Sequence, residues 1–285
     1  MGFQINNNVA AFNAYRNLSV TQNSVSSSLE KLSSGLRINP AADDAAGLAI
    51  SEGLRSQVGG LKVAVRNAQD GISVVQTAEG ALSTSTSILK RMRDLSVQAA
   101  NTGGLSTEAT ANIQTEFNQL SEELTRIADT TQFNGKKLLD GSYEGAFQVG
   151  ANATEQITVE INTGTAATGM GAVGLGVATA GANTGDPATT LLVDDEDTIS
   201  AIDTAIQTIS TARADLGAKQ NRLEMTIKNL NVSVENLTAS ESRIRDTDMA
   251  AEMVSFTKSQ ILSQAGTAML AQANQMGQGV LQLLR

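Results

Sequence analysis

The sequence predicts a mainly α-helical protein: a long antiparallel bundle that resembles a coiled coil. Its terminal helices are expected to pair in a coiled coil, and a small β-hairpin and Gly-rich insert interrupts the rods. Apolar residues recur at every seventh position in several long stretches. Only 3% of residues are aromatic although 41% are hydrophobic, a balance that favours rods packed through Ala and aliphatic side chains. Between the two helical halves the composition changes to Gly, Thr, Asn and Ala.

The clearest repeat lies in the second half of the chain. Its two interleaved series are Ile202, Ile209, Leu216, Leu223, Leu230, Leu237 and Ile244, and Ile199, Ile206, Ile227 and Val234. This spacing indicates a long helix in a coiled-coil-like bundle. Arg213 is one of the residues that interrupt the second series. The acidic residues just before the repeat predict the start of the helix, with Asp197 or Thr198 as its N-cap.

A matching repeat lies in the first half, at Leu54, Leu61, Ala68, Val75, Leu82 and Leu89, with Val58, Val65 and Ile72 between them. Asn39-Pro40 is expected to start this helix, with Asn as cap and Pro in the first helical position. After the break at 101–104, a third helix carries Ile113, Phe117, Leu120, Leu124 and Ile127 on one face. Residues of about 40–130 and 198–245 should therefore form one bundle.

The segment between the rods has the signals of β-structure. Asn134-Gly135 and Asp140-Gly141 punctuate short alternating runs at 146–149 and 157–161, which predict β-hairpins. Residues 161–185 carry no charge, yet large apolar side chains are few there. An exposed turn is therefore favoured over a membrane span.

Both ends of the chain carry apolar stripes that the central bundle cannot cover. These stripes should pair with each other and then with other copies of the chain, and the ends should be disordered before assembly because isolated helices are marginal in water. The expected domains are a terminal coiled coil (1–42 plus 246–285) and a helical rod (43–245) with its insert at about 131–193. The expected self-assembly interface comprises Ile5, Leu18, Val25, Leu29, Leu32, Leu36, Leu262, Met269, Met276, Val280 and Leu283.

Composition argues against catalysis. The chain has no His and no Cys, so the usual general base, thiolate nucleophiles and common zinc ligands are missing. Asp43-Asp44 and the pair Asp246 and Asp248 are expected to cap helices or make salt bridges. The motif Gly169-x-Gly171-x-x-Gly174 lacks the strand–turn–helix of a dinucleotide site. We expect no enzyme, cofactor or metal. A net charge of −9 also argues against nucleic-acid binding, and no membrane partner is expected.

Several long motifs carry a family resemblance. Arg37-Ile38-Asn39 with residues 43–50 resembles the N-terminal signature of bacterial flagellins, and Thr131–Gly135 fits the same family. Residues 236–248 and 260–285 are similar to its C-terminal region. The resemblance implies a short flagellin without large outer domains. It implies a subunit that is exported unfolded by the flagellar type III apparatus and polymerises into the extracellular filament for swimming motility.

The resemblance also implies partners. These are other copies of the chain, the flagellar cap, hook–filament junction proteins and an export chaperone. Toll-like receptor 5 would contact Arg91, Leu95, Gln98 and Glu116, and inflammasome receptors would sense Leu281, Leu283, Leu284 and Arg285. Three alternatives compete with this interpretation. A hook–filament junction protein is disfavoured by the closeness of the signatures at both ends, and an enzyme carried in the insert by the short insert and the absence of His. A coiled-coil adhesin or effector would form soluble oligomers in place of open filaments. Only a heterologous, non-closing contact would propagate into a filament.

Overall fold

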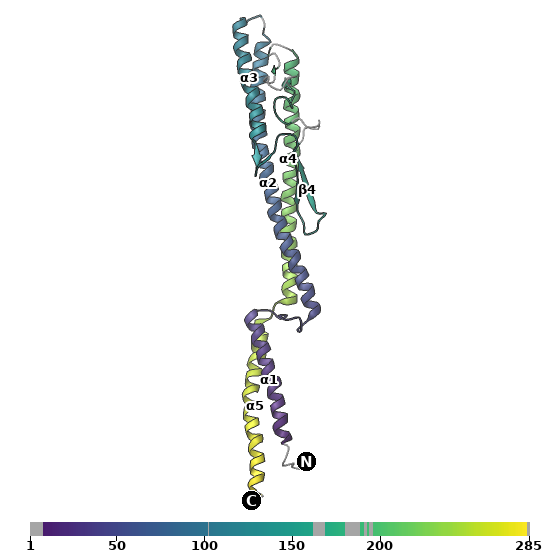
Figure 1. Cartoon of the computed structure of the whole chain (residues 1–285), viewed down its shortest axis with the longest axis vertical. Coiled ribbons are helices and arrows are strands. Elements are labelled where there is room, and N and C mark those ends of the chain that lie inside the picture. The colour runs from purple at the N-terminus through teal and green to yellow at the C-terminus, as the bar shows by residue number, and fades with distance from the viewer. Residues whose placement is uncertain are drawn as a thin grey trace. The chain divides into compact units, whose positions relative to one another are not determined.

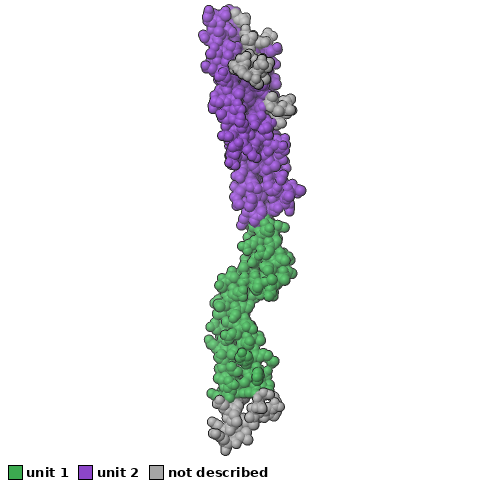
Figure 2. All heavy atoms as spheres, viewed as in Figure 1, with its two compact units in different colours: residues 1–58, 235–285 green, residues 59–234 purple. Residues whose placement is uncertain are grey.

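The structure is a computed structural model that describes residues 8–101, 103–161, 169–179, 189–190, 193 and 196–283. It divides into two compact units, shown in Figure 2: unit 1 comprises residues 1–58 and 235–285, and unit 2 comprises residues 59–234. The domain boundaries expected from the sequence stay a prediction.

Five helices confirm the predicted mainly α-helical fold over the described residues (Figure 1). They are α1 (Val9–Ser34), α2 (Ala45–Ala99), α3 (Thr107–Thr130), α4 (Glu196–Arg245) and α5 (Met249–Leu283). The six short strands are β1 (Gln132–Phe133), β2 (Lys136–Lys137), β3 (Glu144–Gln148), β4 (Gln156–Glu160), β5 (Ala178–Thr179) and β6 (Thr189–Thr190). They form three two-stranded antiparallel sheets.

The core of unit 2 follows the heptad repeats. Leu82 and Leu89 of α2 are buried, as are Leu216 and Leu223 of α4 and Phe117 of α3. These side chains belong to one continuous hydrophobic cluster, so the three helices bury their apolar stripes against one another as the spacing predicts. In Figure 1, α3 runs alongside α2.

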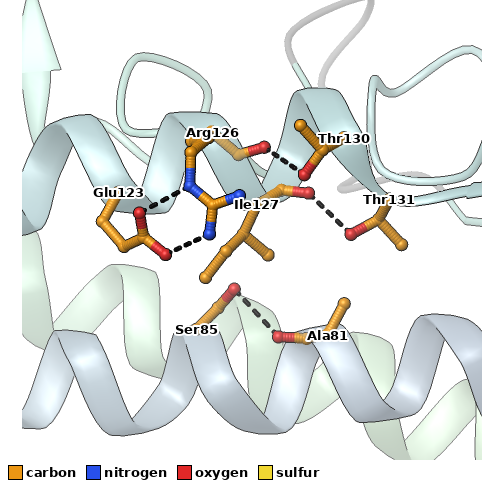
Figure 3. A network of polar contacts seen from close by, with 7 residues as sticks. All are labelled: Ala81, Ser85, Glu123, Arg126, Ile127, Thr130 and Thr131. Carbon is orange, nitrogen blue, oxygen red and sulfur yellow. Dashed lines mark hydrogen bonds and ion pairs between the residues drawn. The ribbon is translucent and has the colours of Figure 1, made fainter.

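Polar side chains in this bundle mostly bond to their own helix. Figure 3 shows the α2–α3 contact, where Ile127 points toward Ser85. Ser85 donates to the carbonyl of Ala81, and Thr131 to that of Ile127 at the end of α3. Arg126 bonds Glu123 on the exposed face and thereby lowers the pKa of that carboxyl. Hydroxyls can therefore lie near the core because the backbone satisfies them.

The predicted hairpins are present. In β1–β2, Asn134 and Gly135 both adopt positive φ (49° and 78°), as a tight two-residue hairpin turn requires. The β3–β4 hairpin packs on the helices of unit 2: an added Cβ at Gly71 of α2 would lie 3.3 Å from both Phe147 and Leu223. Asn67 of α2 also donates to the carbonyl of Gln148. Residues 162–168, 180–188 and 191–192 of the predicted insert lie outside the described residues.

Two predicted helix starts differ from the structure. Asn39-Pro40 does not begin a helix, because α2 begins at Ala45 and the Asp44 carboxylate accepts from the Gly47 backbone N–H at 2.9 Å. The Asn39 side chain instead donates to Glu30 of α1. Helix α4 begins at Glu196, whereas Asp197 or Thr198 was predicted to be its N-cap.

Candidate self-assembly surface

Helices α1 and α5 of unit 1 lie side by side in antiparallel orientation (Figure 1). Near one end of the pair, the Asn8 side chain donates to the carbonyl of Ala273 at 2.8 Å. At the other end, Leu36 and Asp246 form an isolated antiparallel β-bridge. The predicted pairing of the terminal helices in one chain is confirmed.

The seam between these helices is built largely from small side chains. Its inward positions on α1 are Ala11, Ala14, Leu18, Thr21, Val25, Ser28 and Leu32, and those on α5 are Phe256, Ser259, Ser263, Gly266, Leu270 and Ala273. Most of them are only half-buried; Ser28 and Ala273 are buried. An added Cβ at Gly266 would lie 3.2 Å from Leu18, so the glycine lets the two helices approach closely. The larger seam side chains, such as Leu18, Val25 and Leu32, stay only partly covered in the pair.

The outward faces of the same helices expose large apolar side chains. On α1 these are Val9, Phe12, Tyr15, Val20 and Leu29; on α5 they are Met249, Met253, Val254, Ile261, Leu262 and Met269. A shallow, mainly apolar groove of about 500 Å³ on α5 is lined by Met253, Val254, Thr257, Lys258, Ile261 and Leu262. We call the eleven exposed apolar side chains, five on α1 and six on α5, the outward stripe. So many exposed large apolar side chains on one pair of helices are typical of an interaction site.

The structure divides the predicted interface residues into two groups. Leu18, Val25, Leu32 and Leu36 are half-buried in unit 1, whereas Leu29, Leu262 and Met269 face outward, 50–65% exposed. Ile5, Leu284 and Arg285 lie outside the described residues. Met276, Val280, Leu281 and Leu283 lie on α5, but the structure does not describe their side chains.

The predicted interface included only Leu29, Leu262 and Met269 of the outward stripe. Phe12, Tyr15 and Val20 belong to no single heptad series. Val254 and Ile261 are seven residues apart, and that spacing was the available signal for a second stripe on α5. When a helix carries apolar residues on two faces, a single periodic series describes only one of those faces.

A compact junction joins α1, α4 and α5 within unit 1. The Arg37 backbone N–H donates to the Arg245 carbonyl at 2.6 Å, and the Thr247 N–H donates to the Gly35 carbonyl at 3.0 Å. Ile38 is buried, and Arg245 pairs with Glu52 of α2 at 2.6 Å. Asp248 accepts from the backbone of Ala250 and Ala251 at the start of α5, which confirms the expected capping role of that residue.

The four residues expected to contact a receptor come from α2 and α3. Arg91 and Glu116 form an ion pair at 2.7 Å, with both side chains roughly half exposed. Gln98 is exposed, whereas Leu95 is 2% exposed and belongs to the core of unit 2. Leu95 therefore supports this surface from below and is not open to direct contact in this conformation.

The model of the bacterial flagellin N-terminal helical region matches residues 5–144, and that of the C-terminal helical region matches residues 199–284. The flagellin of Bacillus subtilis strain 168 is 50% identical over 304 residues, covering 99% of this chain and all of its relative. The chain belongs to the bacterial flagellin family. A flagellin of Halalkalibacterium halodurans is 51% identical, with 99% of both chains covered.

Membership of the flagellin family identifies the chain as a structural subunit of the flagellar filament and not an enzyme. Its length matches that of these relatives, so it is a short flagellin. A flagellar hook-associated protein from Vibrio parahaemolyticus shares the fold, with a TM-score of 0.55 over 72% of this chain and all of that structure, but is only 14% identical. Its fold alone does not favour the junction-protein alternative. Among the described residues, no helix is long and apolar enough to span a bilayer.

Proposed function

We propose that the outward stripe of α1 and α5 is the surface through which this flagellin polymerises. The observation that carries the proposal is the contrast within unit 1. The seam of the helix pair consists largely of small, half-buried side chains, while large apolar side chains face outward, with Phe12 and Val254 both 70% exposed. Burying one such side chain contributes about 1.5–3 kcal/mol, so contact with neighbouring copies would add substantially to the stability of unit 1.

Polymerisation should also order the terminal helices. The α1–α5 pair alone lacks a large core, and helices of this kind are marginal in water without tertiary packing. Subunits would therefore present loosely ordered ends until they dock, and docking would couple folding to growth. Such ends suit a chain that is exported unfolded through the flagellar type III apparatus and added beneath a cap. An export chaperone would shield the apolar ends before that, and junction proteins would offer the first docking surface.

Seeded polymerisation tests the proposal. The full chain is compared with a chain lacking residues 1–38 and 250–285, and with Ile261→Ser in the full chain, by light scattering and electron microscopy. Gln260→Ala is the matched control, because Gln260 is the exposed polar neighbour of Ile261 on the same helix. Filaments from the full chain and the control, with a raised critical concentration for Ile261→Ser, are expected. A full chain that closes into small oligomers would overturn the proposal.

We also propose that the exposed face of α2 around Arg91 and Gln98, together with Glu116 of α3, contacts Toll-like receptor 5. The support is their exposure on adjacent helices and the Arg91–Glu116 pair that holds two of them in place. Receptor signalling should fall for Arg91→Ala and stay unchanged for Arg93→Ala, whose partner is Asp203 on α4. Equal signalling from both variants would contradict this contact.

We also propose that inflammasome receptors sense the C-terminal tail that contains Leu281 and Leu283. Deletion of this tail without loss of the inflammasome response would contradict that proposal.

A further inference from the structure

The junction of unit 1 contains contacts between segments about two hundred residues apart. Residues 35–37 and 245–247 exchange two backbone hydrogen bonds, from Arg37 to Arg245 and from Thr247 to Gly35. The Arg37 guanidinium additionally donates to the carbonyl of Ile244. One residue of the N-terminal segment thus satisfies two consecutive carbonyls at the end of α4.

The Arg37 contacts lie at the C-terminal end of α4, where the helix cannot satisfy its own backbone carbonyls. The last carbonyls of a helix have no partner within it, and a cation there is favoured by the helix dipole. α4 ends at Arg245, and α5 begins only four residues later at Met249. The direction in which the chain leaves α4 therefore fixes where α5 starts, and Arg37 bonds to the backbone at that point.

The N-terminal side of the junction is itself anchored. Gly35 adopts a left-handed conformation (φ 72°) and donates its N–H to the Lys31 carbonyl, which closes α1. Ile38 is buried, and Asn39 bonds Glu30 of α1. Arg37 thus projects from a segment that α1 holds in place.

We infer that Arg37 is a positioning residue for assembly: by holding the α4–α5 turn, it couples the order of the N-terminal segment to the placement of α5 along α1. This inference rests on the proposed function, because α5 presents six of the eleven side chains of the outward stripe. In a copy that lacks the Arg37 hydrogen bond, the position of α5 along α1 would vary. The exposed apolar faces of the two helices would then vary in their relative position. Such a copy would dock on neighbouring copies less tightly.

The test uses the full chain with Arg37→Ala, which removes the guanidinium bond and leaves the backbone bonds. A charge-assisted hydrogen bond at an exposed position predicts a critical concentration for seeded growth raised about three- to tenfold. In filaments formed above that concentration, the Thr247 amide, which bonds Gly35, should exchange faster by a similar factor. Arg37→Lys keeps the positive charge and a donor group at the end of the side chain. It should therefore restore part of the growth and part of the Thr247 amide protection.

Arg55→Ala is the matched control, because Arg55 is an exposed arginine of unit 1 whose side chain makes no hydrogen bond or ion pair to the described residues. It should change neither readout. Unaltered growth by Arg37→Ala would overturn the inference. So would slower growth with normal Thr247 exchange, since Arg37 would then act directly on a neighbouring copy. If the unaltered chain fails to polymerise, the proposed function fails instead.

Discussion

Glu79 of α2 and Arg213 of α4 form an ion pair across the helix seam of unit 2. Arg213 Nη2 lies 2.7 Å from Glu79 Oε1, and both side chains are a little over one-third exposed. The hydrogen bond from Arg213 and the attraction of the carboxylate raise the pKa of the arginine. Arg213 interrupts an apolar heptad series in the sequence. In the structure, an ion pair with Glu79 of α2 replaces the apolar contact at that position.

Removing either partner of this pair should destabilise the chain modestly. Glu79→Ala and Arg213→Ala should each lower the free energy of unfolding by about 0.5–1 kcal/mol, because the pair is partly solvated. The double variant should cost about as much as either single one, since one interaction is lost in all three. Urea unfolding followed by circular dichroism measures this cycle. Additive losses would show that the two side chains do not interact, and Arg222→Ala, an exposed position on the same helix, serves as control.

Two phenylalanines should separate folding from polymerisation. Phe117 is fully buried and Phe12 is 70% exposed. Phe117→Ala leaves a cavity in unit 2 and should cost about 3–5 kcal/mol of stability. Phe12→Ala should leave the urea midpoint of unit 2 unchanged while it raises the critical concentration for seeded growth. If Phe12→Ala polymerises as well as the unaltered chain, Phe12 plays no part in assembly.

Two glycines should respond to alanine in opposite directions. An added Cβ at Gly169 would clash with the backbone oxygen of Leu139, whereas nothing lies within 4 Å of one at Gly217. Gly169→Ala forces backbone to move and should destabilise by about 1–3 kcal/mol. Gly217→Ala, inside α4, should stabilise by up to about 1 kcal/mol because alanine favours helix. Thermal unfolding of both variants is the measurement. A stabilising Gly169→Ala would contradict the close approach to Leu139, and a destabilising Gly217→Ala would contradict the open space at Gly217.

The turn between β3 and β4 should loosen in acid. The pKa of Glu155 is lowered because its carboxylate accepts hydrogen bonds from the side chain and backbone of Asn152. A lowered folded pKa means that these bonds stabilise the turn above the unfolded value of 4.5. Their contribution is lost as the pH falls through the folded pKa.

The Asn152 amide shift, followed by NMR against pH, reports this loss. Its midpoint should lie below that of a peptide spanning residues 148–158, and Glu155→Gln should abolish the transition. A midpoint equal to that of the peptide would contradict the assigned bonds.

The sequence predicted the helices and hairpins well because their signals are local and repeated. The heptads ending at Leu89 and Ile244 mark α2 and α4, and Asn134-Gly135 marks a turn whose positive φ angles follow from its residue types. The start of α2 was missed because the Asn39 side chain bonds Glu30, a contact that forms only when α1 and the junction fold together.

The candidate site was less predictable. Heptad spacing identified apolar positions such as Leu18 and Leu262 but could not say which face inward, because both faces of α5 carry apolar residues. The link from Arg37 to the end of α4 joins segments about two hundred residues apart. No periodic pattern carries that information.

The small-residue seam between α1 and α5 has a kinetic consequence. Two or three subunits meeting in solution would share only part of the outward stripe and would still carry the entropy cost of ordering their ends. A subunit arriving at the end of an existing filament would contact more copies and cover more apolar surface for the same cost. Elongation at an existing filament end should therefore be faster than nucleation of new filaments. Free subunits should stay monomeric above the critical concentration until filament ends are added as seeds.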